Sequence, residues 1–141
     1  MPKEPPVQIT VCCMMKLESS NLSYEPTELI TYLRERLEKR LLKKGFAIQW
    51  VPQTQNPALL VHMVRLDEGN QALRYLLPFI SPAVLEVQGR VTAPNTTPRQ
   101  FIYAQKAHFG LFGGTPRNMM KLNADRVSAK VAKEVVNAFR S

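Results

Sequence analysis

The sequence contains few of the residues from which reactive centres are built. Its 141 residues include only two cysteines and two histidines. Cys12 and Cys13 are adjacent, and because neighbours on a strand point to opposite faces, a disulfide between them would be strained. We expect one in the core and the other exposed or against a second layer. This pattern fits a reducing compartment, or cysteines used simply as small apolar residues. The absence of a spaced Cys/His set excludes the usual structural zinc motifs.

Long apolar segments are also missing. No apolar run approaches the ~20 residues that a membrane-spanning helix needs. The first six residues, MPKEPP, carry neither the apolar stretch nor the small-residue cleavage site of a secretory signal. The sequence therefore predicts no transmembrane segment. It predicts a cytoplasmic location, or the bacterial cell envelope if a leader has been removed.

No catalytic motif is complete. His62 and His108 each fall inside a predicted strand, and no acid lies at a spacing that would orient them. Asp67 and Glu68 are adjacent on a predicted turn, which is typical of a solvated pair. We therefore expect no enzymatic activity, no cofactor and no metal site.

Positive charge is what the sequence does have. Nineteen lysines and arginines against eleven acidic residues give a net charge of +8. Such a balance favours anionic partners, although basic residues spread along the whole chain also serve solubility alone. With 45% hydrophobic residues, the chain can form one core, so we predict a single domain over residues 1–141 with an irregular lead-in at 1–6.

Apolar periodicity predicts five strands and two helices. Alternating or apolar runs place the strands at residues 7–15, 46–51, 58–66, 84–92 and 100–109. The first helix begins near Pro26 and ends before Gly45, which can adopt a left-handed cap. Its apolar stripe consists of Leu29, Leu33, Leu37 and Leu41.

A second helix closes the sequence. Thr115 suits its cap and Pro116 its first position. The predicted stripe consists of Met120, Ala124, Val127, Val131 and Val135, with Phe139 near the end. The order is β-α-β-β-β-β-α, which predicts an α+β two-layer sandwich. We expect a mostly antiparallel sheet of about five strands with both helices on one face.

The segment GLFGGTPR at residues 110–117 is the most distinctive motif. Its glycines precede a helix N-terminus, where free N–H groups favour anions, but the Lys-Ser/Thr pair of a phosphate loop is absent. One interpretation is a sharp turn that fits the helix against the sheet. The other is an anion or partner contact, with these candidate residues: Arg74, Gly110, Gly113, Gly114, Thr115 and Arg117.

From residue 67 onward the chain resembles a bacterial domain family of unknown function found mostly in envelope lipoproteins. The resemblance is carried by GNQALR at 69–74, the apolar linker 75–80, the alternating strand 84–92, the GLFGG elbow at 110–114 and the closing Ala/Val-rich helix. It implies a non-enzymatic, envelope-associated domain. The sequence departs from the family in having no lipobox cysteine before the domain and prolines in the linker.

Two functions follow from these observations. The first is a non-catalytic binding or assembly module that contacts a protein partner through an exposed sheet edge or through the Arg74 and 110–117 loops. The alternative is a small basic nucleic-acid-binding domain, in which Phe101 and Tyr103 would stack on bases from one strand face beside Arg99 and Lys106.

Overall fold

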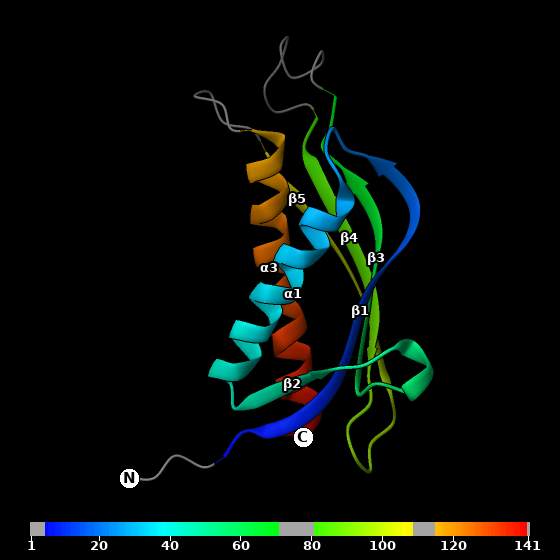
Figure 1. Ribbon diagram of the computed structural model, residues 1–141, viewed down its shortest axis with the longest axis vertical. Coiled ribbons are helices and arrows are strands. Elements are labelled where there is room, and N and C mark those ends of the chain that lie inside the picture. The colour runs from blue at the N-terminus through cyan, green and yellow to red at the C-terminus, as the bar shows by residue number, and fades with distance from the viewer. Residues whose placement is uncertain (1–4, 71–80, 109–114, 141) are drawn as a thin grey trace.

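Five strands form one sheet, and two helices cover one of its faces (Figure 1). The computed structural model describes residues 5–70, 81–108 and 115–140. Within them the elements are β1 (Val7–Asn21), α1 (Pro26–Lys43), β2 (Phe46–Trp50), the 3-10 turn η1 (Gln53–Gln55), β3 (Leu59–Asp67), β4 (Ala83–Val91), β5 (Arg99–Ala107) and α3 (Pro116–Phe139). The predicted α+β class and the order β-α-β-β-β-β-α are confirmed.

The strands lie in the order β2-β1-β3-β4-β5. β1 runs parallel to both of its neighbours, because α1 carries the chain back to the start of β2 and η1 carries it back to the start of β3. β3, β4 and β5 are antiparallel. The antiparallel ladders join eight and nine residue pairs, and the parallel ladders join five and eight. On this count the sheet is mostly antiparallel, as expected.

β1 is longer than its sequence pattern predicted. The apolar alternation stops at Met15, but the strand continues to Asn21. Its register shifts between Met15 and Ser19, after which residues 19–21 pair again with residues 65–67 of β3. The prediction was wrong here because the outer part of β1 leaves the helix-covered core. Figure 1 shows this part curving away from the helices.

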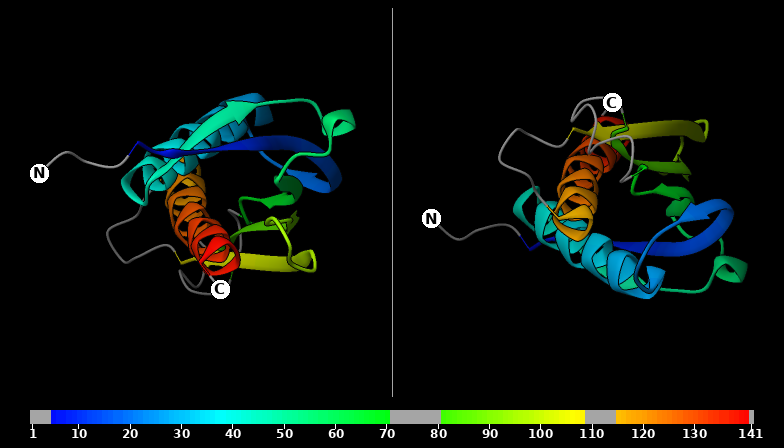
Figure 2. Two further views of the ribbon diagram at one scale, coloured as in Figure 1. Left: turned by 90° about the horizontal axis from the view of Figure 1, so that it is seen from below. Right: turned by 90° about the horizontal axis from the view of Figure 1, so that it is seen from above.

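Both helices bury the stripes that their sequences predicted, and the views along the sheet show both on one face (Figure 2). All four leucines of the α1 stripe are at most 1% exposed, and Gly45 follows the helix with φ of 92°. At α3, the Thr115 hydroxyl accepts a hydrogen bond from the Asn118 N–H at 3.1 Å, and the predicted stripe is buried. No helix among the described residues is both long and apolar enough to span a membrane.

Both cysteines are buried as free thiols. Cys13 belongs to the helix-covered core, whereas Cys12 lies on the opposite face of β1 and is 7% exposed. Hence neither thiol is the exposed cysteine that the sequence allowed. The second cysteine is instead held at a cleft along the edge of the sheet.

Candidate partner-binding cleft

The cleft arises because β1 extends beyond the end of its neighbour β2. β2 pairs with β1 only from Val7 to Val11. The Val51 N–H then donates to the Val11 carbonyl at 2.9 Å, and the chain turns away through Pro52 into η1. Within the described residues, no strand pairs with this side of β1 beyond Val11. The main chain of β1 is therefore left as an open edge in the middle of the molecule.

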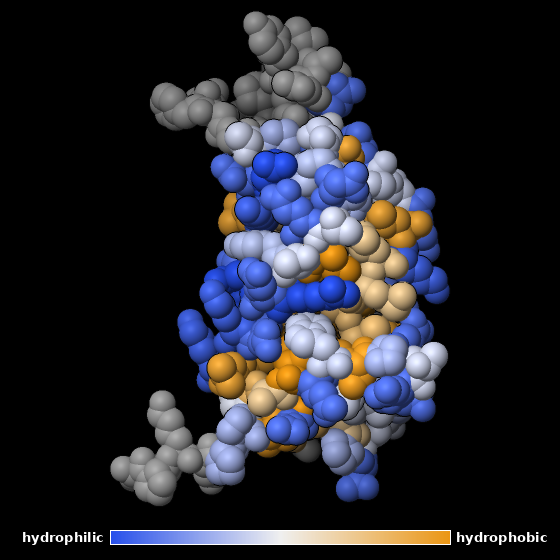
Figure 3. Space-filling view, in the orientation of Figure 1, coloured by the Kyte–Doolittle hydropathy of each residue, from blue (hydrophilic) through white to orange (hydrophobic). Residues whose placement is uncertain are grey.

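Side chains from three elements enclose this edge in a cleft of about 640 Å³. α1 forms one wall with Thr31, Arg34 and Glu35, and Trp50 and Val51 form the other. Cys12, Cys13 and Met14 of β1 lie between the walls. Figure 3 shows the resulting apolar band, hollowed and flanked by hydrophilic side chains of α1. We call this region the edge cleft.

Arg34 reaches across the edge cleft to the strand. Its Nε and Nη2 atoms donate to the Cys13 carbonyl at 3.0 and 2.5 Å. The guanidinium carbon lies 6.0 Å from the centroid of the Trp50 ring, which is 39% exposed. No carboxylate within the described residues forms an ion pair with Arg34. An aromatic side chain and a cation thus stand beside an open strand edge, a combination common where proteins bind one another.

The two thiols in the cleft are poor nucleophiles. Burial raises the pKa of Cys13 to about 12, although the Arg34 charge opposes the rise. Burial also raises the pKa of Cys12, again against Arg34. Because the thiolate is the reactive form, both side chains are protonated and unreactive at neutral pH. The cleft can bind, but these cysteines give it no covalent chemistry.

The two histidines do not meet. His62 lies opposite Gln88 of β4, whereas His108 follows the end of β5, where Ala107 pairs with Ala83. The pKa of His62 is lowered by burial and then by Lys16 and Arg90. Among the described residues, no three His, Cys, Asp or Glu side chains are placed to hold a metal ion.

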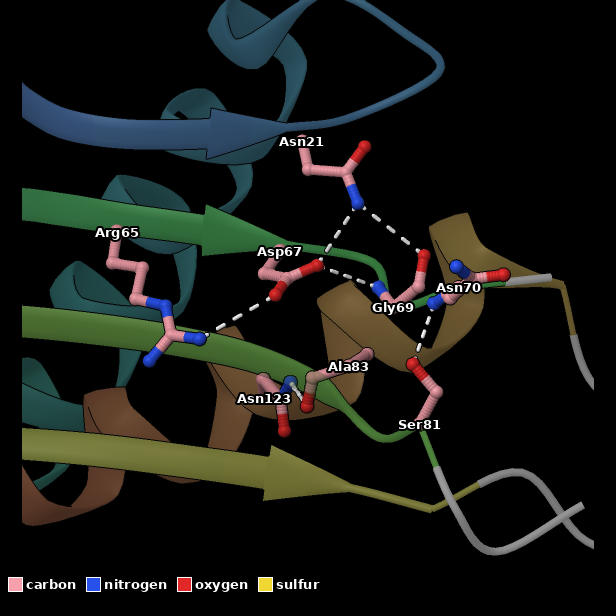
Figure 4. Close-up of polar contacts among 8 residues, drawn as sticks. All are labelled: Asn21, Arg65, Asp67, Gly69, Asn70, Ser81, Ala83 and Asn123. Carbon is pink, nitrogen blue, oxygen red and sulfur yellow. Dashed lines mark hydrogen bonds and ion pairs between the residues drawn. The ribbon is translucent and has the colours of Figure 1, made fainter. Parts of the chain in front are cut away.

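Asp67 and Glu68 bind main-chain amides and are not a simple solvated pair. Asp67 accepts hydrogen bonds from the Gly69 N–H at 2.8 Å and from the Asn21 amide at 3.0 Å (Figure 4). Glu68 accepts from the Ser23 N–H at 3.1 Å. Burial alone would raise the pKa of Asp67, but the donors around it outweigh burial and lower the pKa. The two carboxylates therefore tie the end of β1 to the turn after β3.

Only two of the candidate residues from the sequence lie in the described part of the chain; Arg74, Gly110, Gly113 and Gly114 lie outside it. Thr115 caps α3. Arg117 pairs with Glu28 at 3.2 Å and lies 4.8 Å from the centroid of the Tyr24 ring. Arg117 is thus engaged within the chain, between the first turns of the two helices.

The edge cleft itself was missed in the sequence, although an exposed sheet edge was expected as a contact surface. One signal was available. The predicted strand at 46–51 is shorter than the predicted strand at 7–15, and Pro52 ends it two residues after Trp50, the only tryptophan. A short strand beside a longer one leaves part of the longer strand unpaired.

Comparison with solved structures finds matches from several bacteria. The protein XCC0632 from Xanthomonas campestris, of the family DUF330, matches with a TM-score of 0.54 at 8% identity, over 96% of this chain and 89% of that one. A neuraminyllactose-binding hemagglutinin homologue from Helicobacter pylori matches with a TM-score of 0.48 at 16% identity, over 96% and 90% of the two chains. A PelC dodecamer from Paraburkholderia phytofirmans gives 0.45 at 11% identity, over 97% and 95%.

The similarity to XCC0632 shows a shared fold. It supports, at the level of fold, the expected resemblance to a bacterial domain of unknown function. No protein-family model matches the chain, and no curated protein matches its sequence.

Proposed function

We propose that this protein is a non-catalytic binding module that captures an extended segment of a partner protein along the open edge of β1. The observation that carries the proposal is the edge cleft, where the strand edge of β1 beyond Val11 lies between a polar wall from α1 and an apolar wall formed by Trp50 and Val51. An added strand would replace Arg34 as the donor to the Cys13 carbonyl and extend the main-chain hydrogen bonds along β1, and its alternate side chains would contact the walls.

The composition of the cleft supports a peptide ligand. Trp50 supplies a large, half-exposed aromatic surface of the kind that dominates binding energies. Arg34 keeps N–H donors beyond the two that hold Cys13, and these suit a carbonyl or carboxylate of the incoming segment. β5, the outermost strand on the other side of the sheet, offers a weaker alternative. It carries Arg99 and Lys106, charges that discourage strand addition at an edge.

The absence of catalysis is part of the proposal. Its support is the protonated state of Cys12 and Cys13 and the separation of His62 from His108. Association with the bacterial cell envelope is likewise proposed, from the resemblance of residues 67–139 to a domain of envelope lipoproteins.

The structure does not favour the nucleic-acid alternative, because the two aromatic side chains expected to stack on bases are packed inside the protein. Phe101 is only 6% exposed and stacks on Tyr103 at 5.5 Å in the helix-covered core. The Tyr103 hydroxyl donates to Glu134 of α3. These rings are therefore not available to bases.

Trp50 makes the binding proposal directly testable. It is the only tryptophan, so its fluorescence reports on the cleft alone. Peptides would be selected by phage display against the full chain and titrated while Trp50 emission is recorded. We expect saturable emission changes, and we expect Thr31→Arg to weaken binding by about tenfold or more, because the long side chain enters the cleft from α1.

Thr97→Arg is the matched control, since it makes the same change in the turn between β4 and β5, away from the cleft. It should bind the peptides as the original chain does. Peptides that bind without changing Trp50 emission, or that bind the Thr31→Arg variant equally well, would show that the edge cleft is not the binding site.

A further inference from the structure

A second surface, the basic groove, lies where the later turns of α1 pass α3. It encloses about 580 Å³, and six of its nine lining residues are lysine or arginine. The cations are Arg36, Lys39, Arg40, Lys43, Lys44 and Lys133. Between them the floor is apolar, formed by Ala129, Ala132 and Val136 of α3. Among the residues that the structure describes, no acidic side chain lines the groove.

Most of this positive charge is not neutralised within the protein. Arg36 and Arg40 share one carboxylate, Asp125, at 2.7 and 2.9 Å. The ammonium groups of Lys39, Lys43 and Lys133 form no ion pair or hydrogen bond with any described residue, and neither does that of Lys44. Like charges held this close raise the local potential and attract a polyanion.

Exposed apolar side chains border the same cations. Leu42 is 58% exposed and lies between the groove residues Arg40 and Lys43 in α1. Lys44 also lines a smaller cleft of about 280 Å³, formed with Pro5, Val7, Phe46 and Phe139. Val7 is 53% exposed. Lysines beside exposed aliphatic groups are typical of surfaces that lie at a membrane interface, where the ammonium stays at the headgroups.

We infer that the basic groove and its apolar border dock on the surface of an anionic phospholipid membrane. The lysines contact lipid phosphates, and Leu42 and Val7 enter the interface beside them. A nucleic acid fits less well, because the aromatic rings near this surface are not free to stack. Phe46 and Phe139 pack edge-to-face on each other at 5.4 Å. This surface is separate from the edge cleft, so either proposal can fail alone.

Vesicle co-sedimentation of the full chain tests the inference. The probes are vesicles of neutral phosphatidylcholine and vesicles in which about a third of the lipid is phosphatidylglycerol. We expect binding only to the anionic vesicles and a steep decrease with salt. Lys39→Gln/Lys43→Gln/Lys133→Gln should weaken it on the order of a hundredfold, since each lysine near an anionic surface contributes about one kcal/mol. Leu42→Ser should weaken it further at high salt.

The matched control is Lys16→Gln/Arg90→Gln/Lys106→Gln, which removes the same charge from the opposite face of the sheet. It should retain most of the binding. Equal losses in the two triple variants would overturn the inference, because binding would then follow net charge alone. Retention of a short single-stranded oligonucleotide by the groove, with no vesicle binding at low salt, would overturn it in favour of nucleic acid.

Discussion

At the scale of single residues, the most demanding position is Gly89 in β4. A Cβ atom there would lie 2.3 Å from the Leu60 carbonyl oxygen and 2.4 Å from the Phe101 ring. The ring fills the space above the glycine and covers the sheet. In the alternating strand 84–92, Gly89 falls in the same series as Leu85, Val87 and Val91. This pattern does not show that the Phe101 ring occupies the space that a side chain at position 89 would fill.

Gly89→Ala should lower the free energy of unfolding by about 2–4 kcal/mol, because the Leu60 carbonyl belongs to a neighbouring strand and cannot move aside cheaply. Urea denaturation measures the loss. Adding Phe101→Leu to the Gly89→Ala variant should restore only part of the lost stability. The second substitution relieves the contact of the new methyl group with the ring but leaves its contact with the Leu60 carbonyl. A loss below about 0.5 kcal/mol would show that the strands separate easily at this point.

The cysteines give a second prediction at this scale. Because both thiols are buried and the pKa of each is raised, an aromatic disulfide reagent at pH 8 should label neither in the native protein and both after unfolding. The absorbance of the aromatic thiolate that the reagent releases measures the labelling. Rapid reaction of the native chain would mean that the edge cleft opens enough to ionise Cys12.

At the scale of elements, the helices were predictable and the reach of β1 was not. Leu29 and Leu41 were found because apolar periodicity reports directly on the buried face of a helix. The end of β1 at Asn21 depends on pairing with β3, which lies far along the chain. The edge cleft depends on the different lengths of β1 and β2. The relative lengths of strands far apart in the chain produce no local sequence pattern. The elements around the cleft could therefore be predicted, but the cleft itself could not.

The cap of α3 is testable by itself. Thr115→Ala should cost about 1 kcal/mol, because the Asn118 N–H loses its acceptor at the first turn. Thr115→Ser should retain nearly all of the stability. Urea midpoints of the two variants measure the difference. Equal destabilisation by both substitutions would point to packing of the threonine methyl group in place of capping.

At the scale of the whole molecule, one carboxylate links the two helices. Asp125 of α3 accepts from both Arg36 and Arg40 of α1. Burial alone would raise the pKa of Asp125, but the hydrogen bonds from Arg40 and Arg36 outweigh burial and lower it below the ordinary value. The folded state therefore gains stability from Asp125 above the unfolded pKa, and loses it as the pH falls through the folded pKa.

Asp125→Asn should cost about 1 kcal/mol at pH 7. The difference from the original chain should shrink as the pH falls below the ordinary carboxyl pKa, and it should vanish below the lowered pKa of folded Asp125, where both chains carry a neutral side chain at this position. Denaturant unfolding from pH 7 to pH 2 measures both stabilities. A difference that stays constant with pH would mean that the substitution acts through packing alone.

The position of β1 also has a kinetic consequence. β1 is made first, yet it lies between β2 and β3. The hairpins β3-β4 and β4-β5 can form from neighbouring segments, whereas β1 must wait for partners made after α1. In a nascent chain β1 can pair with β2 once α1 and β2 have left the ribosome, but the other edge of β1 stays unpaired until β3 follows. During this interval the apolar residues of β1 are open to chaperones.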